Sequence, residues 1–461
     1  MNRRFTVLRL FACLIVLLGI AIGVVAALAW YSPITPIDRM PADRFDARLI
    51  RQGADLAALG DCDTCHTAPN GRSFVGGLPV PTPFGTIYST NITPDPETGI
   101  GRWSEAAFRR ALRQGVDREG RQLYPAFPYD HFTRLTDDDV TALYAYLMTR
   151  TPVRASAPPN ALPFPLNHRF VVAGWKLLFF NPGTYRPDPA HDAAWNRGAY
   201  LVEGIGHCGA CHTPRNALGA EKSSRFFAGG EAEGWTAFPI NAAAASPVPW
   251  NADSLYAYLR QGWHGLHGVA EGPMAPVSAD LAGASDGDVR SIAAYVASII
   301  GETAPADRPE GRTLAAMTRP FGTGAKPQSA GSQAAAAPAV VGDGAGATIY
   351  AGACAGCHES GRPVPYGGTD LSLSTALNGS TPRNLINILF EGIPAADGAR
   401  APIMPDFGAV LTDTQLADLA RFLRAKFTDK LAWTEIDAAV RQARSRRATA
   451  EASTSAAAGN P

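Results

Sequence analysis

The distribution of apolar and polar positions predicts a largely helical chain that begins with an apolar segment. Residues 10–30 are apolar almost throughout, and Arg3, Arg4 and Arg9 precede them. A run of this length is enough to cross a bilayer as a helix, and the preceding arginines predict a cytoplasmic N-terminus. We therefore expect a signal anchor or transmembrane helix over residues 1–32, a single pass through the inner membrane, and a periplasmic location for the rest of the chain. A cleaved signal peptide is the alternative.

Further along the chain, one succession of helical patterns occurs three times. Each copy opens with a short helical pattern, continues with one that ends at a glycine, and closes with an amphipathic helix. Glycine directly after a helical run signals a C-terminus. The opening helices are expected over residues 47–60, 195–206 and 345–352, and the glycines are Gly115, Gly262 and Gly392.

Each closing helix carries an aliphatic and an aromatic residue three positions apart, which places both side chains on one face. These pairs are Leu143 and Tyr146, Ile292 and Tyr295, and Leu419 and Phe422.

The repetition predicts three domains, a number that suits a chain of 461 residues. The segment between the second and third domains is rich in Ala, Pro, Gly and Ser without a period, which predicts a flexible linker. A short apolar run over residues 169–180 is too short to span a membrane, so it either packs between domains or rests on a membrane or partner surface. The expected segments are the domains 41–152, 190–302 and 342–429, a connecting segment 153–189, the linker 303–341, and a C-terminal tail 430–461 that is frayed or disordered from about Arg441.

The charge of the chain is balanced, with 41 Lys and Arg residues against 41 Asp and Glu residues. Such a chain carries no net field that would attract nucleic acid, so we expect no nucleic-acid partner.

Six of the seven cysteines lie in three copies of Cys-x-x-Cys-His, at residues 62–66, 208–212 and 354–358. This pattern is the attachment signature of c-type haem, in which two thiols form thioethers to the haem and the histidine binds its iron. One Cys-x-x-Cys alone is equally typical of a zinc half-site or a redox disulfide. Three copies, whose histidines are 146 residues apart in both intervals, instead predict three covalent haems c. The seventh cysteine, Cys13, is interpreted as a small hydrophobic residue.

The predicted haem-binding cysteines are Cys62, Cys65, Cys208, Cys211, Cys354 and Cys357, and the predicted proximal iron ligands are His66, His212 and His358.

An electron-transfer haem needs a second axial ligand, for which methionine is usual because it raises the potential. Met274 follows Gly262 by twelve residues, and Met404 follows Gly392 by the same interval. Both methionines lie beside prolines in loop-like sequence, and we predict that both ligate iron.

In the first domain, the same interval leads to Phe127, which cannot bind iron. His131 and Met148 are the other donors there. Met148 is interpreted as a core residue at the end of the closing helix, whereas His131 is expected to be the axial ligand of a bis-histidine haem. The rival interpretation is a five-coordinate or water-bound haem that binds small ligands.

The chain resembles the three-haem cytochrome c subunits of bacterial membrane-bound periplasmic dehydrogenases, which act on alcohols, gluconate or aldehydes. Besides the haem motifs, the resemblance rests on four segments, at residues 89–95, 123–129, 272–275 and 404–408. It implies an all-α fold of three tandem cytochrome c-like domains. In cytochromes c, the face of the closing helix that carries the aliphatic and aromatic pair crosses the N-terminal helix.

The resemblance also implies a role in a respiratory chain. Such subunits take electrons from a catalytic dehydrogenase subunit, accompanied by a small iron–sulfur subunit, and pass them to ubiquinone or a terminal oxidase. Residues 124–132, Tyr-Pro-Ala-Phe-Pro-Tyr-Asp-His-Phe, are similar to cytochromes paired with molybdenum hydroxylases that oxidise aldehydes or N-heteroaromatics.

The sequence contains neither a Gly-x-Gly-x-x-Gly dinucleotide motif after a strand nor a spare cysteine cluster. We therefore expect a non-catalytic electron-transfer subunit. Two other functions stay open: a haem peroxidase or small-ligand reductase that works at the first haem, and a free-standing electron shuttle.

Overall fold

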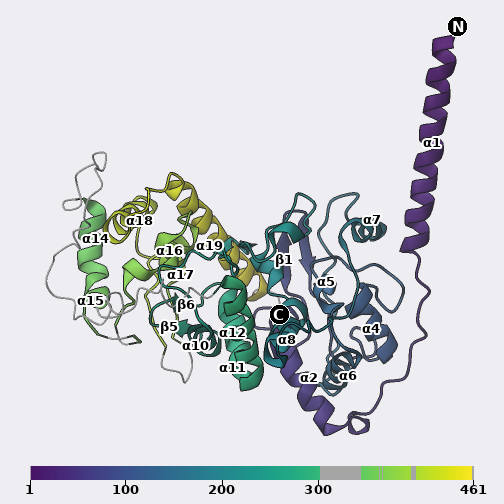
Figure 1. The fold of residues 1–461 in the computed structure, drawn as a ribbon, viewed down its shortest axis with the longest axis horizontal. Helices are drawn as coiled ribbons and strands as arrows, with labels where there is room; N and C mark the ends of the chain where they lie inside the picture. Colours follow the sequence, from purple (N-terminus) through teal and green to yellow (C-terminus); the bar gives the residue numbers. More distant parts are fainter. Residues whose placement is uncertain (1, 302–343, 363, 366, 396–400, 459–461) are drawn as a thin grey trace. The chain divides into compact units, whose positions relative to one another are not determined.

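The computed structural model describes residues 2–301, 344–362, 364–365, 367–395 and 401–458 (Figure 1). The predicted linker over 303–341 lies outside the described residues. Contacts divide the chain into two compact units. The first comprises Met1–Ala210, Arg215–Lys222 and Gly283–Tyr295, and the second comprises Cys211–Pro214, Ser223–Ala282 and Val296–Pro461.

Helices account for most of the regular structure up to residue 212. They are α1 (Asn2–Ala29), η1 (Ala42–Arg44), α2 (Ala47–Leu59), α3 (Cys62–Cys65), α4 (Glu105–Gln114), α5 (Tyr129–Phe132), α6 (Asp137–Met148), α7 (Phe170–Phe179), α8 (Ala193–Tyr200), the π-helical turn η2 (Leu201–Ile205) and α9 (Gly209–His212).

The later helices lie between residues 223 and 458. They are η3 (Ser223–Arg225), α10 (Ala252–Gln261), α11 (Met274–Gly283), α12 (Asp286–Ile300), α14 (Ala345–Ala353), α15 (Ala355–His358), η4 (Leu371–Leu373), α16 (Thr375–Asn378), α17 (Arg383–Glu391), α18 (Asp413–Phe427) and α19 (Ile436–Ala458).

Local capping explains where several helices begin and end. The side chains of Asp46, Ser104 and Thr136 accept hydrogen bonds from backbone N–H groups in the first turns of α2, α4 and α6. These bonds satisfy donors that have no partner inside a helix. Gly115 and Gly262 adopt positive φ angles of 59° and 77° after α4 and α10, as the sequence predicted for helix C-termini.

The expectation of an all-α fold is wrong, because the described residues include three two-stranded antiparallel sheets. They pair β1 (Pro79–Thr82) with β2 (Gly85–Tyr88), β3 (Gly230–Ala232) with β4 (Trp235–Ala237), and β5 (Trp263–His264) with β6 (Gly268–Val269). The β3–β4 turn shows the cause: Glu233 and Gly234 both have positive φ angles, 50° and 81°. Such a two-residue turn matches the twist of antiparallel strands.

The prediction of a transmembrane helix over residues 1–32 is also wrong. The N-terminal segment forms the helix α1, but in the described part of the chain no helix is both long and apolar enough to cross a membrane. Crossing requires about 20 consecutive, mostly apolar residues. The expectation of a single-pass inner-membrane protein, held in the membrane by this helix, is corrected accordingly.

The predicted crossing of opening and closing helices is confirmed in all three repeats. Gly53 of α2 lies against the backbone of Ala142 and the Cβ of Tyr146 in α6, so that a Cβ added at Gly53 would come within 2.7 Å of the Tyr146 Cβ. The same close approach joins Gly198 to Tyr295, at 2.7 Å, and Gly346 to Phe422, at 2.8 Å. Each aromatic residue of the closing helix therefore packs where the opening helix has no side chain.

The C-terminal segment forms a helix where a frayed or disordered tail was expected. Residues 436–458 form α19, which packs against α17 and α18. The physical reason is burial: Trp433, Ile436, Val440 and Ala443 are each 8% exposed or less and belong to the same core as Leu416.

We predict that Gly53→Ala destabilises the first unit by about 2 kcal/mol, because overpacking a tight helix crossing costs roughly 1–3 kcal/mol. Thermal unfolding of the haem-loaded protein, followed by circular dichroism, measures the change. Gly174→Ala on α7 is the matched control, since nothing lies within 4 Å of a Cβ there. Equal effects of the two substitutions would contradict the role assigned to Gly53.

Candidate haem sites

The three Cys-x-x-Cys-His motifs lie on short helical turns that follow the opening helices. The first occupies α3 and His66, the second ends in α9, and the third ends in α15. In the first and third motifs the leading cysteine is the less exposed: Cys62 is partly exposed and Cys354 is buried, whereas Cys65 and Cys357 are exposed. These two motifs therefore present one thiol toward the interior and a second closer to the surface.

All three motif histidines are held in the same way, by a backbone carbonyl at Nδ1. The distances are 2.6 Å from His66 to the Thr90 oxygen, 2.7 Å from His212 to the Phe238 oxygen, and 2.9 Å from His358 to the Thr369 oxygen. A carbonyl only accepts, so Nδ1 carries the proton and Nε2 keeps its lone pair. This is the tautomer that binds a metal through Nε2.

The electrostatic surroundings of the first two histidines favour the same neutral state. Burial lowers the pKa of both His66 and His212, although each carbonyl hydrogen bond partly opposes it. A neutral imidazole is the form that can donate its lone pair to iron.

A buried asparagine explains how the Thr90 carbonyl reaches His66. The Asn91 side chain is 4% exposed. Its Oδ1 accepts from Thr93 N and Thr93 Oγ1 at 2.9 and 2.7 Å, and its Nδ2 donates to the Val153 oxygen at 2.7 Å. The segment 89–95, one of those that carry the family resemblance, therefore positions His66, the predicted proximal ligand.

The first and second motifs share a backbone frame. The histidine carbonyls accept from Gly76 N at 2.6 Å and from Gly229 N at 2.8 Å. The threonine after each histidine accepts from Phe74 N and from Phe227 N. In the third motif the carbonyl that binds the histidine lies only eleven residues further along, at Thr369. Two sites are thus built alike, and the third is built differently.

The loops that were predicted to supply the second axial ligands also repeat. Gly115 O accepts from Leu123 N, and Gly262 O accepts from Ala270 N, each at 2.7 Å and each eight residues on. Four residues later, Phe127 N and Met274 N each donate to the carbonyl three residues back, at 3.1 and 3.3 Å. The structure therefore gives Phe127 and Met274 equivalent backbone positions, in agreement with the twelve-residue interval.

Both predicted methionines lie after the expected glycines, but not both in loops. Met274 is the first residue of α11, so the interpretation of its segment as purely loop-like is wrong for this residue. Met404 forms a backbone bridge with Ile393, at 2.8 and 2.9 Å, and packs partly buried against the core of the second unit.

His131 is placed in a setting that does not favour iron ligation. It is 5% exposed on α5. Its Nδ1 lies 2.9 Å from the Glu203 carbonyl oxygen and its Nε2 lies 2.8 Å from Glu221 Oε1. Burial alone would lower the pKa of His131, but the hydrogen bond and charge of Glu221, with the charge of Asp130, outweigh it and raise that pKa.

These arrangements suit covalently attached haem c. The three motif histidines are held by carbonyl groups with Nε2 left to bind a metal, and the leading cysteine of each motif lies about one helical turn before its histidine. Haem c supplies an iron that exchanges single electrons; the chain supplies its attachment, its axial ligands and its dielectric surroundings.

Comparison with known families supports the same cofactor. The family described as cytochrome c matches residues 50–151, and the family described as cytochrome c oxidase, cbb3-type, subunit III matches residues 343–423. The cytochrome c domains of this chain therefore carry covalently bound haem c.

Among curated relatives, one of the subunits of the nicotinate dehydrogenase of Pseudomonas putida is 44% identical over 431 residues, 92% of this chain. The chain spans only 34% of the length of that relative. The fructose dehydrogenase cytochrome subunit of Gluconobacter japonicus is 36% identical and covers 86% of the chain, which spans 82% of that protein. The gluconate 2-dehydrogenase cytochrome c subunit of Pantoea cypripedii is also 36% identical. The match covers 84% of this chain and 87% of that protein. By these similarities, this chain belongs to the family of dehydrogenase cytochrome c subunits.

Proposed function

We propose that this chain relays electrons through three covalent haems c, from the catalytic subunit of a dehydrogenase to ubiquinone or a terminal oxidase. The observation that supports it most is the repeated geometry of the three proximal histidines, each with a carbonyl at Nδ1 and Nε2 left for iron. Three such sites on one chain suit a multistep electron path better than a single reaction centre.

The partner that the similarities favour is a molybdenum hydroxylase that oxidises aldehydes or N-heteroaromatic compounds, and a small iron–sulfur subunit would connect it to the haems. Support comes from the 44% identity to a protein of a nicotinate dehydrogenase. Nicotinate is an N-heteroaromatic acid. The segment 124–132 supports the same branch of the family.

In this proposal, Met274 and Met404 complete the second and third haems. Methionine as the second axial ligand raises the potential of a haem. Electrons would therefore be drawn toward these two haems, and the protein sets the order of potentials through the ligands that it offers.

The relay is tested by purifying the tagged, full-length chain from its native host together with whatever catalytic subunit accompanies it. We expect nicotinate or an aromatic aldehyde to reduce most of the haem within the complex, as followed by the visible haem bands. A sample without substrate is the control. A chain that purifies alone, and that no catalytic subunit reduces, would favour a free-standing shuttle instead.

The number of haems is tested by intact mass after expression with a cytochrome c maturation system. We expect three haems on the natural sequence and two on each variant in which both cysteines of one motif become alanine, because thioether attachment needs the motif thiols. Cys13→Ala, outside the motifs, should keep all three. A natural chain with fewer than three haems would refute the three-haem relay.

The axial methionines are tested by redox titration of the haem bands. Met274→Ala should lower the potential of one haem by on the order of 100 mV, within the ≈0.8 V that axial ligands span. Met404→Ala should do the same to another haem. Met148→Leu is the matched control, a volume-conserving change of a fully buried methionine that we expect to leave the potentials in place. Unchanged potentials in the Met274 variant would exclude it as a ligand.

A further inference from the structure

The loop after Gly115 takes the same course as the loop that carries Met274, but it offers no donor atom at the equivalent position. Its closing hydrogen bond from Leu123 and the turn at Tyr124 match those at Ala270 and Glu271, residue for residue. Phe127 therefore stands where the second haem receives methionine. An aromatic hydrocarbon side chain cannot bind iron. A second axial ligand would therefore have to come from another side chain of this unit.

Phe127 is partly exposed, and its ring contacts are with aromatic side chains. Its ring lies 5.3 Å from Phe132 and 6.5 Å from Tyr129, measured between ring centroids. Tyr129 is fully buried, and its ring is covered by Phe180 at 5.2 Å and Trp175 at 6.4 Å. This packing holds the loop in place without a metal–sulfur bond.

His131 is the nearest alternative donor in sequence, and both of its ring nitrogens are engaged. The carbonyl of Glu203 can only accept, so Nδ1 donates to it; the carboxylate of Glu221 likewise accepts from Nε2. Arg215 Nη2 lies 3.7 Å from Glu221 Oε1, and the Asp130 carboxyl group interacts electrostatically with both His131 and Glu221. Positive and negative charges around His131 therefore offset one another. Freeing Nε2 for iron would leave the Glu221 carboxylate, 14% exposed at its side chain, without this partner.

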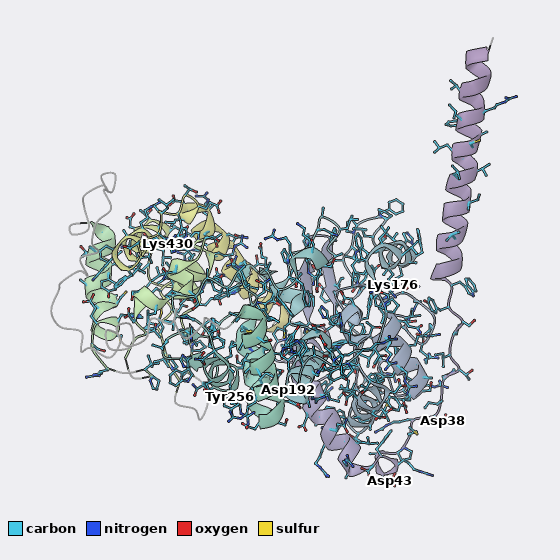
Figure 2. All side chains as sticks on the ribbon, in the orientation of Figure 1. Asp38, Asp43, Lys176, Asp192, Tyr256 and Lys430 are labelled. Atoms are coloured by element: carbon cyan, nitrogen blue, oxygen red, sulfur yellow. The ribbon has the colours of Figure 1, made fainter. Side chains whose placement is uncertain are left out.

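Three further donors of the first unit also have other places or partners. His207 adjoins the second motif rather than the distal loop, and its Nε2 lies 3.3 Å from the Gly60 carbonyl oxygen, to which it can only donate. Met148 stands two positions after Tyr146, the place that Ala297 and Arg424 take in the other closing helices, so it is not an element of the distal loop. Lys176, labelled in Figure 2, has a pKa that burial lowers to about 7. Its Nζ nevertheless donates to Gln114 O, Gly115 O and Gln122 Oε1, at 2.5, 2.7 and 2.6 Å.

We propose that Phe127 and His131 leave the distal position of the first haem without a protein ligand, and that this apolar position binds small neutral diatomic molecules. The inference rests on the proposed function, because it requires haem at residues 62–66. Polarity and steric access on the distal side decide whether a haem binds gases or only transfers electrons. The phenylalanine rings favour a neutral ligand over an anion, because an anion would lose its hydration without gaining a hydrogen bond.

The test uses carbon monoxide on the reduced, full-length protein whose haem content has first been established by mass. We expect one of the three haems to bind carbon monoxide, seen as a change in its Soret band. Phe127→Met should abolish this binding, because a thioether placed as in Met274 then competes for the iron. His131→Gln, which keeps hydrogen-bonding capacity, should leave the binding and the haem spectra unchanged.

Each outcome of this test either supports or overturns the proposed gas binding. A protein with three haems that takes up no carbon monoxide overturns the inference while leaving the relay intact. Uptake that arises only in His131→Gln identifies His131 as the ligand and also overturns it. If His131→Gln does not fold, the natural chain and Phe127→Met still give the answer. Fewer than three haems by mass would refute the proposed function itself, independently of the gas.

Discussion

The fold depends on the crossing of an opening helix with a closing helix at a residue that has no side chain. Gly53, Gly198 and Gly346 let the two backbones approach, and Tyr146, Tyr295 and Phe422 fill the space beside each crossing. Because each haem motif follows its glycine within about three helical turns, the crossing fixes where the two cysteines and the histidine emerge.

On this frame, a single hydrogen bond holds each motif histidine in the tautomer that can bind a metal. The carbonyls of Thr90, Phe238 and Thr369 hold the proton on Nδ1 and leave the lone pair on Nε2. The carbonyl in turn needs support, which for Thr90 comes from the buried amide of Asn91. A polar residue in the interior is thus tolerated because its hydrogen-bonding groups find partners.

The three sites are related but not equivalent. The first two share the glycine, threonine and phenylalanine contacts around the histidine, whereas the third reaches its carbonyl by a shorter loop. The first two sites do differ in the loops that were predicted to supply the second axial ligands. The first loop carries Phe127 at the backbone position where the second carries Met274. A common backbone frame with different side chains at equivalent positions therefore gives the sites different surroundings.

The sequence alone determined the haem motifs, the capping glycines, the aromatic faces of the closing helices and the equivalence of Phe127 with Met274, because each follows from residue type and local spacing. It could not determine the carbonyl partners of the histidines, which lie 24, 26 and 11 residues away, nor the Glu221 partner of His131, 90 residues away. It also did not predict the hairpins or the packed helix α19. Its prediction of a membrane-spanning helix at the N-terminus was wrong. The hairpins, α19 and these partners depend on burial and on long-range hydrogen bonds, which form only once the chain has folded, so only the tertiary structure decided them.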